Sequence, residues 1–193
     1  ALRERNISEL NDGYQIDFIG KDYAKKQTGE SPESVITPTK KEQIITNQKN
    51  KENIFLTGDN LEGLRHLINN YENSIDMIYI DPPYNTGSDG FNYPDDFEYS
   101  GAQLKRMFGL NDEELQKLTS IQGKATHSAW LTFMYPRLWL AKRLLTSKGV
   151  IVISIDDNEE ANLKLLLNEI FGEVNKLPGF VWQNKQGGGN DST

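Results

Sequence analysis

Residues 81–87 read DPPYNTG and directly follow the apolar run at 75–80. Each proline fixes its φ at about −65° and lacks an amide hydrogen, so the backbone is stiff and its carbonyls find no local donor. The Asp81 carboxylate and the Pro82 carbonyl could accept both hydrogens of one amino group and draw the nitrogen lone pair out of conjugation. Tyr84 offers a face on which a planar base could stack, worth about 1–3 kcal/mol. These residues predict attack on an electrophile by the amine of a base flipped out of a duplex.

A plain turn is the alternative, because two prolines behind a strand are common turn residues. The position of all seven residues directly behind an apolar strand favours the functional interpretation.

Strands and helices alternate along the chain and predict an α/β fold with a parallel sheet. We expect strands at 54–56, 74–80 and 150–157, and helices at 61–71, 127–149 and 158–172. Pro136 should kink or restart the second helix, and Asn158 could cap the third. Residues 179–185 could begin another strand.

Acidic residues lie at or just behind the carboxyl end of each expected strand: Asp59, Asp81, and the pair Asp156 and Asp157. Parallel sheets bind their ligands at this edge. Asp59 and Asn60 could contact the amino group of an adenosine or cap the following helix. The pair at 156–157 is explained better by capping and by the helix dipole.

The segment 88–124 lacks regular hydrophobic spacing, apart from a short helix expected near 112–118. Its aromatic residues Phe91, Tyr93 and Phe97 could meet unstacked bases. His127 could face a substrate, although a structural role explains it better. We expect four large side chains of the next helix in the core: Trp130, Phe133, Leu138 and Trp139.

Composition narrows the function classes. The chain has 193 residues, no cysteine and two histidines, so thiolate and multi-histidine metal sites are excluded and we expect no metal. The net charge of −7, concentrated in 53–175, argues against general nucleic-acid binding. No apolar stretch reaches the roughly 20 residues of a membrane span, and the first ten residues lack a signal-peptide core. We expect a cytoplasmic protein.

Three motifs together resemble the modification subunit of type III restriction-modification systems: LTGDNLEGL at 56–64, SIDMIYIDPPYNTG at 74–87, and the segments HSAWLTFMYPRLWLAKRLL and GVIVISIDDNE between 127 and 159. Members of that family are DNA adenine-N6 methyltransferases of the permuted beta class that use S-adenosylmethionine. The resemblance covers about residues 50–193 and implies a circularly permuted, Rossmann-like class I methyltransferase fold, with an incomplete parallel sheet and flanking helices.

The resemblance also implies roles and partners. Asp81, Pro82, Pro83 and Tyr84 would be catalytic; Asp59, Asn60 and Asp81 would contact the cofactor; and Tyr84, Phe91, Tyr93 and His127 would face the base. The partners would be double-stranded DNA with a flipped adenine, a second modification subunit, and a restriction subunit with helicase and nuclease activity, with no membrane involved.

Three regions are expected: a polar lead-in at 1–52, a partial methyltransferase domain at 53–175, and the start of a target-recognition region at 176–193. The family's glycine-rich cofactor strand, of the DFFAGSG kind, is absent, and QGGGN at 186–190 is better explained as a flexible loop than as a phosphate loop. We therefore expect the chain alone to be inactive and to bind S-adenosylmethionine weakly or not at all.

Two alternatives stay open. The chain could be a non-catalytic remnant or assembly module that keeps the fold without the activity. It could also belong to a cytosine-N4 methyltransferase, although the family's N4 enzymes more often have serine where this chain has Asp81.

Overall fold

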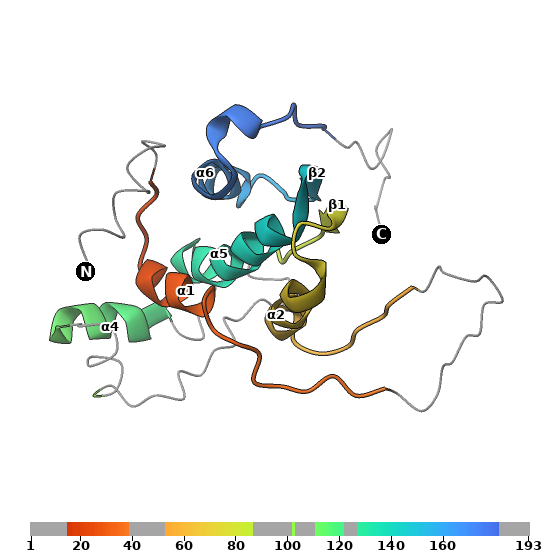
Figure 1. The fold of residues 1–193 in the computed structure, drawn as a ribbon. Coiled ribbons are helices and arrows are strands. Elements are labelled where there is room, and N and C mark those ends of the chain that lie inside the picture. Colours follow the sequence, from red (N-terminus) through yellow and green to blue (C-terminus); the bar gives the residue numbers. More distant parts are fainter. Residues whose placement is uncertain (1–14, 39–52, 87–101, 103–110, 122–126, 182–193) are drawn as a thin grey trace, which may run out of the picture.

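A computed structural model describes residues 15–38, 53–86, 102, 111–121 and 127–181 (Figure 1). Its elements, in chain order, are α1 (Lys21–Gln27), α2 (Asn60–Tyr71), β1 (Ile75–Ile80), α4 (Asp112–Ile121), α5 (His127–Leu144), β2 (Leu145–Ile153), α6 (Glu160–Phe171) and the 3-10 turn η2 (Glu173–Asn175).

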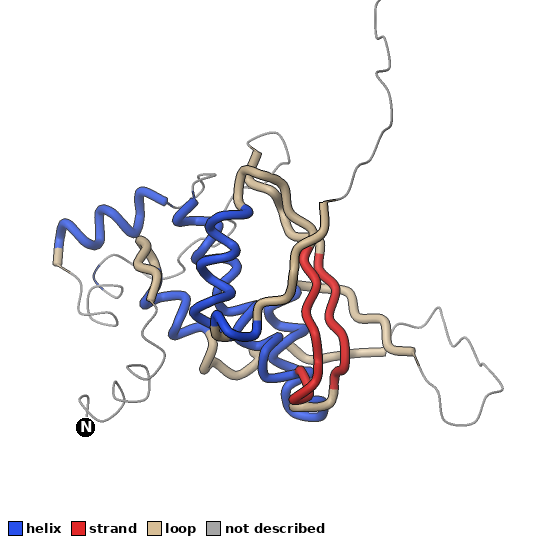
Figure 2. Tube along the Cα trace, turned by 90° about the horizontal axis from the view of Figure 1, so that it is seen from above, coloured by secondary structure: helices blue, strands red, loops and turns tan. Residues whose placement is uncertain are grey.

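The sheet of the described residues consists of β1 and β2, which pair in parallel. Figure 2 shows the strands side by side, with most of the helical turns on one side of them. Parallel strands need a crossover connection, and α5 provides the helix of that crossover. The predicted α/β class with a parallel sheet is confirmed.

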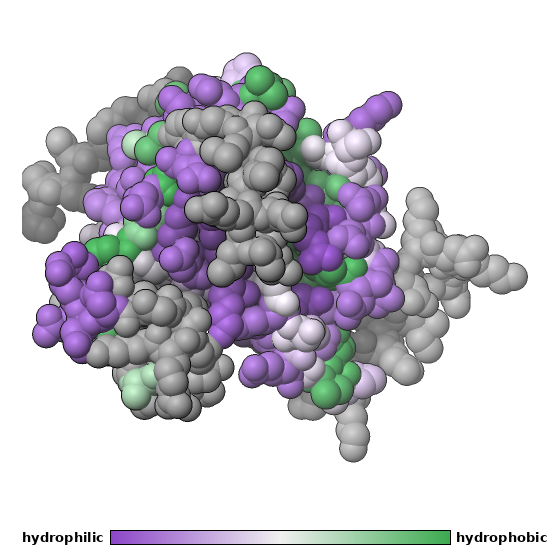
Figure 3. Space-filling view, turned by 60° about the vertical axis from the view of Figure 1, so that its left-hand side comes forward, coloured by the Kyte–Doolittle hydropathy of each residue, from purple (hydrophilic) through white to green (hydrophobic). Residues whose placement is uncertain are grey.

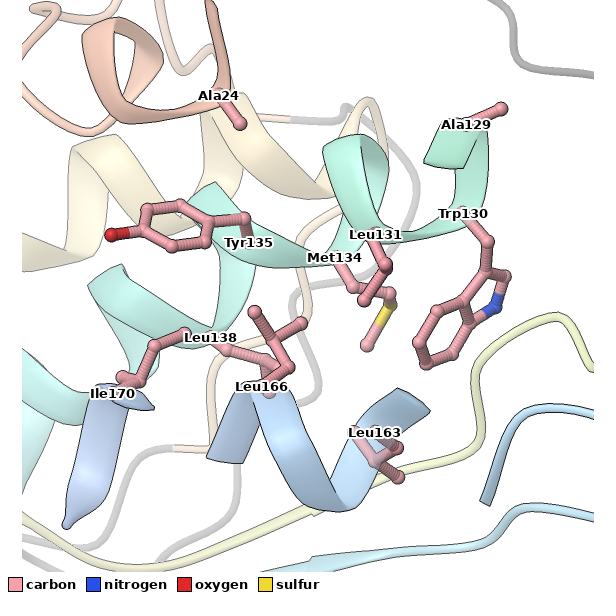
Figure 4. Close-up of a cluster of buried hydrophobic side chains, with 10 residues drawn as sticks. All are labelled: Ala24, Ala129, Trp130, Leu131, Met134, Tyr135, Leu138, Leu163, Leu166 and Ile170. Atoms are coloured by element: carbon pink, nitrogen blue, oxygen red, sulfur yellow. The ribbon is translucent and has the colours of Figure 1, made fainter. Parts of the chain in front are cut away.

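Helix α5 lies at the centre of the hydrophobic core. Its buried side chains meet those of α1 and α6, and the cluster comprises Ala24, Ala129, Trp130, Leu131, Met134, Tyr135, Leu138, Leu163, Leu166 and Ile170 (Figure 4). Full burial of one large apolar side chain contributes about 1.5–3 kcal/mol, so this cluster fixes how α5 and α6 pack. The expected burial of Trp130 and Leu138 is confirmed, and Phe133 is partly buried against the cluster, but Trp139 is 37% exposed.

The strand at 75–80 is less buried than its run of apolar residues suggests. Ile80 packs against the core, whereas Met77 and Tyr79 are 60% and 61% exposed. Val150 and Val152 of β2 are also exposed. Among the described residues the sheet is therefore covered on one face, although parallel sheets normally bury both.

The strand expected at 54–56 does not form, and Ile54 and Phe55 are exposed there. The described residues 176–181 also contain no strand, and the rest of the strand expected at 179–185 lies outside the described part.

The helix expected to end at Gly149 stops at Leu144, and β2 begins at once. Leu145 pairs with Ile75, but the next pair along is Met77 with Val150, so residues 146–149 form an irregularity in the strand. Pro136 neither ends nor restarts α5, which continues through it.

Part of the polar lead-in packs onto the core. Ala24 of α1 is fully buried, and the Lys21 ammonium lies 3.0 Å from the Glu169 carboxylate of α6. The Ile16 amide donates to the same carboxylate at 2.8 Å. Residues 16–27 are therefore tied to the body that carries the strands.

Hydrophilic residues predominate on the face shown in Figure 3, broken by small apolar patches. None of the helices in the described ranges combines the length and the apolar character needed to cross a bilayer.

Candidate functional site

The loop at 81–86 leaves the carboxyl end of β1 beside β2. The Ser154 amide donates to the Ile80 carbonyl at 3.0 Å, which keeps the segments of β1 and β2 paired up to the loop. Within the loop, the Tyr84 hydroxyl donates to Asp81 Oδ1 at 2.7 Å. This hydrogen bond is the main reason why the pKa of Tyr84 is raised above its ordinary value of 10.0. The Asp81 side chain is exposed, and one of its oxygens is already held by Tyr84.

The main-chain carbonyls of this loop have different environments. The Trp130 indole nitrogen donates to the Pro83 carbonyl at 2.6 Å. The Asn158 side-chain amide donates to the Tyr84 carbonyl at 3.0 Å and to the Asn85 carbonyl at 2.7 Å. The Pro82 carbonyl accepts no hydrogen bond from the described residues. In addition to the Asp81 carboxylate, the loop therefore offers a ligand the Pro82 carbonyl, which among residues 82–85 is the main-chain oxygen without a hydrogen bond from the described residues.

Asn85, which directly follows Tyr84, has an unusual backbone conformation. Its φ is 59°, in the left-handed region, and its side chain is buried. Its side-chain amide nitrogen donates to Glu159 Oε1 at 2.6 Å. Glu159 is 0% exposed and also contacts His127 Nδ1 at 2.8 Å and the Asn162 amide at 2.8 Å.

His127 lies at the start of α5 with its side chain 62% exposed, and its ring contacts Glu159. Glu159 occupies the N-cap position of α6 without a side-chain capping bond, and Asn158 bonds the loop through its side chain. The expected capping role of Asn158 is therefore wrong. All three residues lie within the quoted motifs at 74–87 and 149–159, but sequence reasoning gave Asn85 and Glu159 no role and gave Asn158 the role of a cap.

The Asp59 side chain caps α2, accepting from the Leu61 and Glu62 amides at 2.9 and 3.0 Å. The capping interpretation is confirmed, and a role in cofactor binding stays a prediction. Asn60 Oδ1 accepts from Arg137 of α5 at 2.6 Å. Arg137 was not anticipated either, and it ties the beginning of α2 to the core helix.

Asp156 Oδ1 accepts from the Asn158 amide at 3.0 Å in the turn before α6, while Asp157 is exposed. The N-cap residue of α6 is Glu159, so the capping role expected for this pair is wrong, and an effect of the helix dipole stays a prediction. Phe91, Tyr93 and Phe97 lie outside the described residues. In the described ranges no three His, Asp or Glu side chains come together in a way that could hold a metal ion.

Residues 75–193 match the family described as DNA methylase. The chain belongs to this family. The match begins at the first residue of β1 and includes the whole loop at 81–87, α5, β2 and α6.

The curated relatives that the chain matches are much longer than the chain itself. It is 64% identical over 192 residues to the type III restriction-modification enzyme StyLTI Mod subunit of Salmonella typhimurium, covering 100% of this chain and 29% of that protein. It is 40% identical over 185 residues to the EcoP15I Mod subunit of Escherichia coli, covering 95% and 29%. The type II methyltransferase M.KpnI of Klebsiella pneumoniae is 38% identical over 134 residues, covering 69% and 27%. The chain thus spans less than a third of the length of these relatives.

Proposed function

We propose that the chain is the amino-terminal part of the modification subunit of a type III restriction-modification system, and that the complete subunit methylates adenine N6 in DNA. The similarity to two Mod subunits over nearly the whole chain supports the system. The observation that carries the chemistry is the loop behind β1, where the Asp81 carboxylate is exposed and the Pro82 carbonyl is the untaken acceptor among its neighbours.

Two acceptors next to each other suit an exocyclic amino group, which carries two hydrogens. In the proposed reaction the Asp81 carboxylate and the Pro82 carbonyl each accept one of them, and the nitrogen lone pair becomes available as nucleophile. The Tyr84 ring stacks on the base, which lowers the cost of flipping it from the duplex. The rigid backbone then contributes by orientation, because a reacting amine that is already aligned loses little entropy on the way to the transition state.

S-adenosylmethionine, when bound, supplies the electrophilic methyl group. We propose Asp59, Asn60 and Asp81 as its contacts in this chain. The Asp59 side chain is 57% exposed. One of its oxygens caps α2 and the other lies 3.7 Å from an Arg137 guanidinium nitrogen, so the second, exposed oxygen could also accept from an adenosine amino or hydroxyl group. The exposed Asn60 side chain uses its oxygen for Arg137, which leaves the amide nitrogen as a donor. One acceptor from Asp59 and one donor from Asn60 fit the polar edge of an adenosine.

The permuted Rossmann-like topology, the DNA substrate, the second modification subunit, the restriction subunit and the cytoplasmic location are parts of the same proposal. They follow from the resemblance of the motifs and from the names of the relatives.

Asp81→Ala in the complete subunit tests the proposal. We expect methyl transfer from tritiated S-adenosylmethionine to fall by at least about a hundredfold, because the amine loses its anionic acceptor. DNA affinity should stay within about twofold, since a carboxylate contributes little to contacts with phosphates. Asp157→Ala removes another exposed acid at the same edge of the sheet and should leave turnover unchanged.

Wild-type turnover by Asp81→Ala would refute the assigned role. Radiolabel recovered in cytosine instead of adenine would refute the proposed target base.

A further inference from the structure

Glu159 is a buried acid that contacts no lysine or arginine among the described residues, and its basic neighbour there is the His127 ring at 2.8 Å. It is 0% exposed, and the groups around its carboxylate are the Asn85 amide, the His127 ring and the Asn162 amide. Burying a carboxylate is costly unless hydrogen bonds replace the lost water. A carboxylate held in this way fixes the groups that bond to it, because any of them that moves away leaves a charge unsolvated.

One of those groups is the side chain of Asn85, which directly follows Tyr84. Asn85 has a φ of 59°, a conformation that costs an ordinary residue on the order of 1–3 kcal/mol and persists where the surroundings enforce it. The bond of 2.6 Å to Glu159 supplies that enforcement from the side chain. Asn158, the neighbour of Glu159, bonds the carbonyls of Tyr84 and Asn85 from the same short segment.

The segment itself is anchored. Helix α6 begins at Glu160, and its residues Leu163, Leu166 and Ile170 are buried in the core cluster. Asn158 and Glu159 therefore join the loop behind β1 to a helix that is packed into the buried core. Among the described residues, the loop would otherwise be held by the Tyr84–Asp81 bond and by the bond from Trp130 to the Pro83 carbonyl.

We propose that Glu159 is a positioning residue for methyl transfer: its carboxylate holds Asn85 in the left-handed conformation and thereby sets the direction of the Tyr84 ring and of the Pro82 carbonyl. Glu159 touches neither base nor cofactor in this proposal. The inference rests on the proposed function for its catalytic consequence, whereas its structural part can be measured without turnover.

The test uses the complete subunit and a pair of exchanged side chains. In Glu159→Gln, one carboxylate oxygen becomes an NH2 group, so one of the amides that donate to Glu159 would face another donor and lose its hydrogen bond. In the double variant E159Q/N85D, the Gln amide can donate to the new carboxylate, and the bond is restored with its polarity reversed. Glu160→Gln, which removes an exposed acid one residue along, is the matched control.

For E159Q we expect kcat to fall about tenfold or more, with KM for S-adenosylmethionine within about twofold, because misalignment affects the transition state more than cofactor binding. The double variant should recover most of kcat, and E160Q should match the wild type. Wild-type kcat in E159Q, or a double variant no better than E159Q, would overturn the inference.

Hydrogen exchange followed by mass spectrometry separates this inference from the proposed function. In E159Q the amides of 84–86 should exchange at least about fivefold faster, while those of α5 and α6 stay as in the wild type, and the double variant should reverse the change. Unchanged exchange at 84–86 would overturn the inference even if the wild type methylates adenine. A wild type without turnover would defeat the proposed function alone.

If E159Q does not fold, Asn85→Gly takes its place. Glycine adopts the same φ without strain but cannot bond Glu159. A tenfold loss of kcat and faster exchange at 84–86 in the folded variant support the proposal, and wild-type values for both refute it.

Discussion

Tyr84 combines two features in one side chain. Its ring is partly exposed at the end of β1, and its hydroxyl donates to Asp81 Oδ1 at 2.7 Å. The hydrogen bond to the Asp81 carboxylate raises the pKa of Tyr84 above 10.0, so the hydroxyl stays protonated, and remains a donor, throughout the neutral and mildly alkaline range. Stacking and orientation of the carboxylate are therefore separable functions of this residue.

Tyr84→Phe separates them in the complete subunit. The ring remains, so fluorescence of 2-aminopurine placed at the target position should report base stacking as in the wild type. The Asp81 carboxylate loses its orienting donor, and kcat should fall about tenfold. Tyr71→Phe, at the end of α2, is a control that should leave kcat unchanged. An unchanged kcat in Tyr84→Phe would show that the hydroxyl does not orient Asp81 for the reaction.

At the residue scale, the sequence predicted the loop but not its supports. The string at 81–87 carries its chemistry in the residue types, and proline stiffness does not depend on the rest of the fold. Glu159 and Glu160 are adjacent and chemically identical, yet one is fully buried and the other is exposed. Which of them faces the loop depends on how α6 packs against α5, and that packing is a property of the folded chain.

The junction between α5 and β2 shows the limit of prediction at the scale of elements. Lys148 and Gly149 have the residue types of a helix end, but the helix stops at Leu144 and both lie in β2. Gly149 serves a close approach instead. A Cβ at this position would lie 2.9 Å from the Ile75 carbonyl oxygen and 2.9 Å from the Leu145 side chain. A glycine required by a neighbouring backbone looks the same in sequence as a glycine that ends a helix.

Gly149→Ala should therefore destabilise the protein, because the backbone of β1 would have to move away from the new methyl group. We expect a loss of about 1–3 kcal/mol in the free energy of unfolding, measured by urea denaturation. Gly63→Ala in α2 is the matched change, since a Cβ there has no neighbour within 4 Å. Its expected effect is a gain of up to about 1 kcal/mol. Equal effects of the two variants would contradict this account of the junction.

At the scale of the molecule, the lead-in is joined to α2 as well as to the core. Glu62 Oε2 accepts from the Glu33 amide at 2.9 Å and from the Ser34 amide and hydroxyl at 3.0 and 2.7 Å. Arg65 bonds Glu62 at 2.8 Å and reaches the Gln27 carbonyl at 3.0 Å. One carboxylate thus joins residues about thirty positions apart. The polar composition of the lead-in gave no sign of this attachment in the sequence.

Burial raises the pKa of Glu62, but the hydrogen bonds from Arg65, Ser34 and Glu33 outweigh it and lower the pKa from 4.5 to about 2. Because the folded-state pKa is depressed, the stabilisation is fully present above pH 4.5 and is lost as the pH falls toward 2.

Glu62→Gln should lower the free energy of unfolding by about 1 kcal/mol at pH 7, and the difference from the wild type should shrink between pH 4.5 and 2. Urea denaturation across this range measures it. Glu33→Gln, whose exposed side chain lies beside the same attachment, is the control and should give no such pH dependence. A Glu62→Gln deficit that stays constant down to pH 2 would rule out the ionised carboxylate as its cause.

Because Trp130 donates to the Pro83 carbonyl, its fluorescence can report on the conformation of the loop. An indole that is fully buried and donates to a single carbonyl changes its emission when that carbonyl moves, and Trp130 meets both conditions. Trp139 is part-exposed on the same helix, and Trp182 is the third tryptophan of this chain. With both replaced by phenylalanine, the tryptophan fluorescence of the chain would come from Trp130 alone, and the loop would carry its own optical reporter.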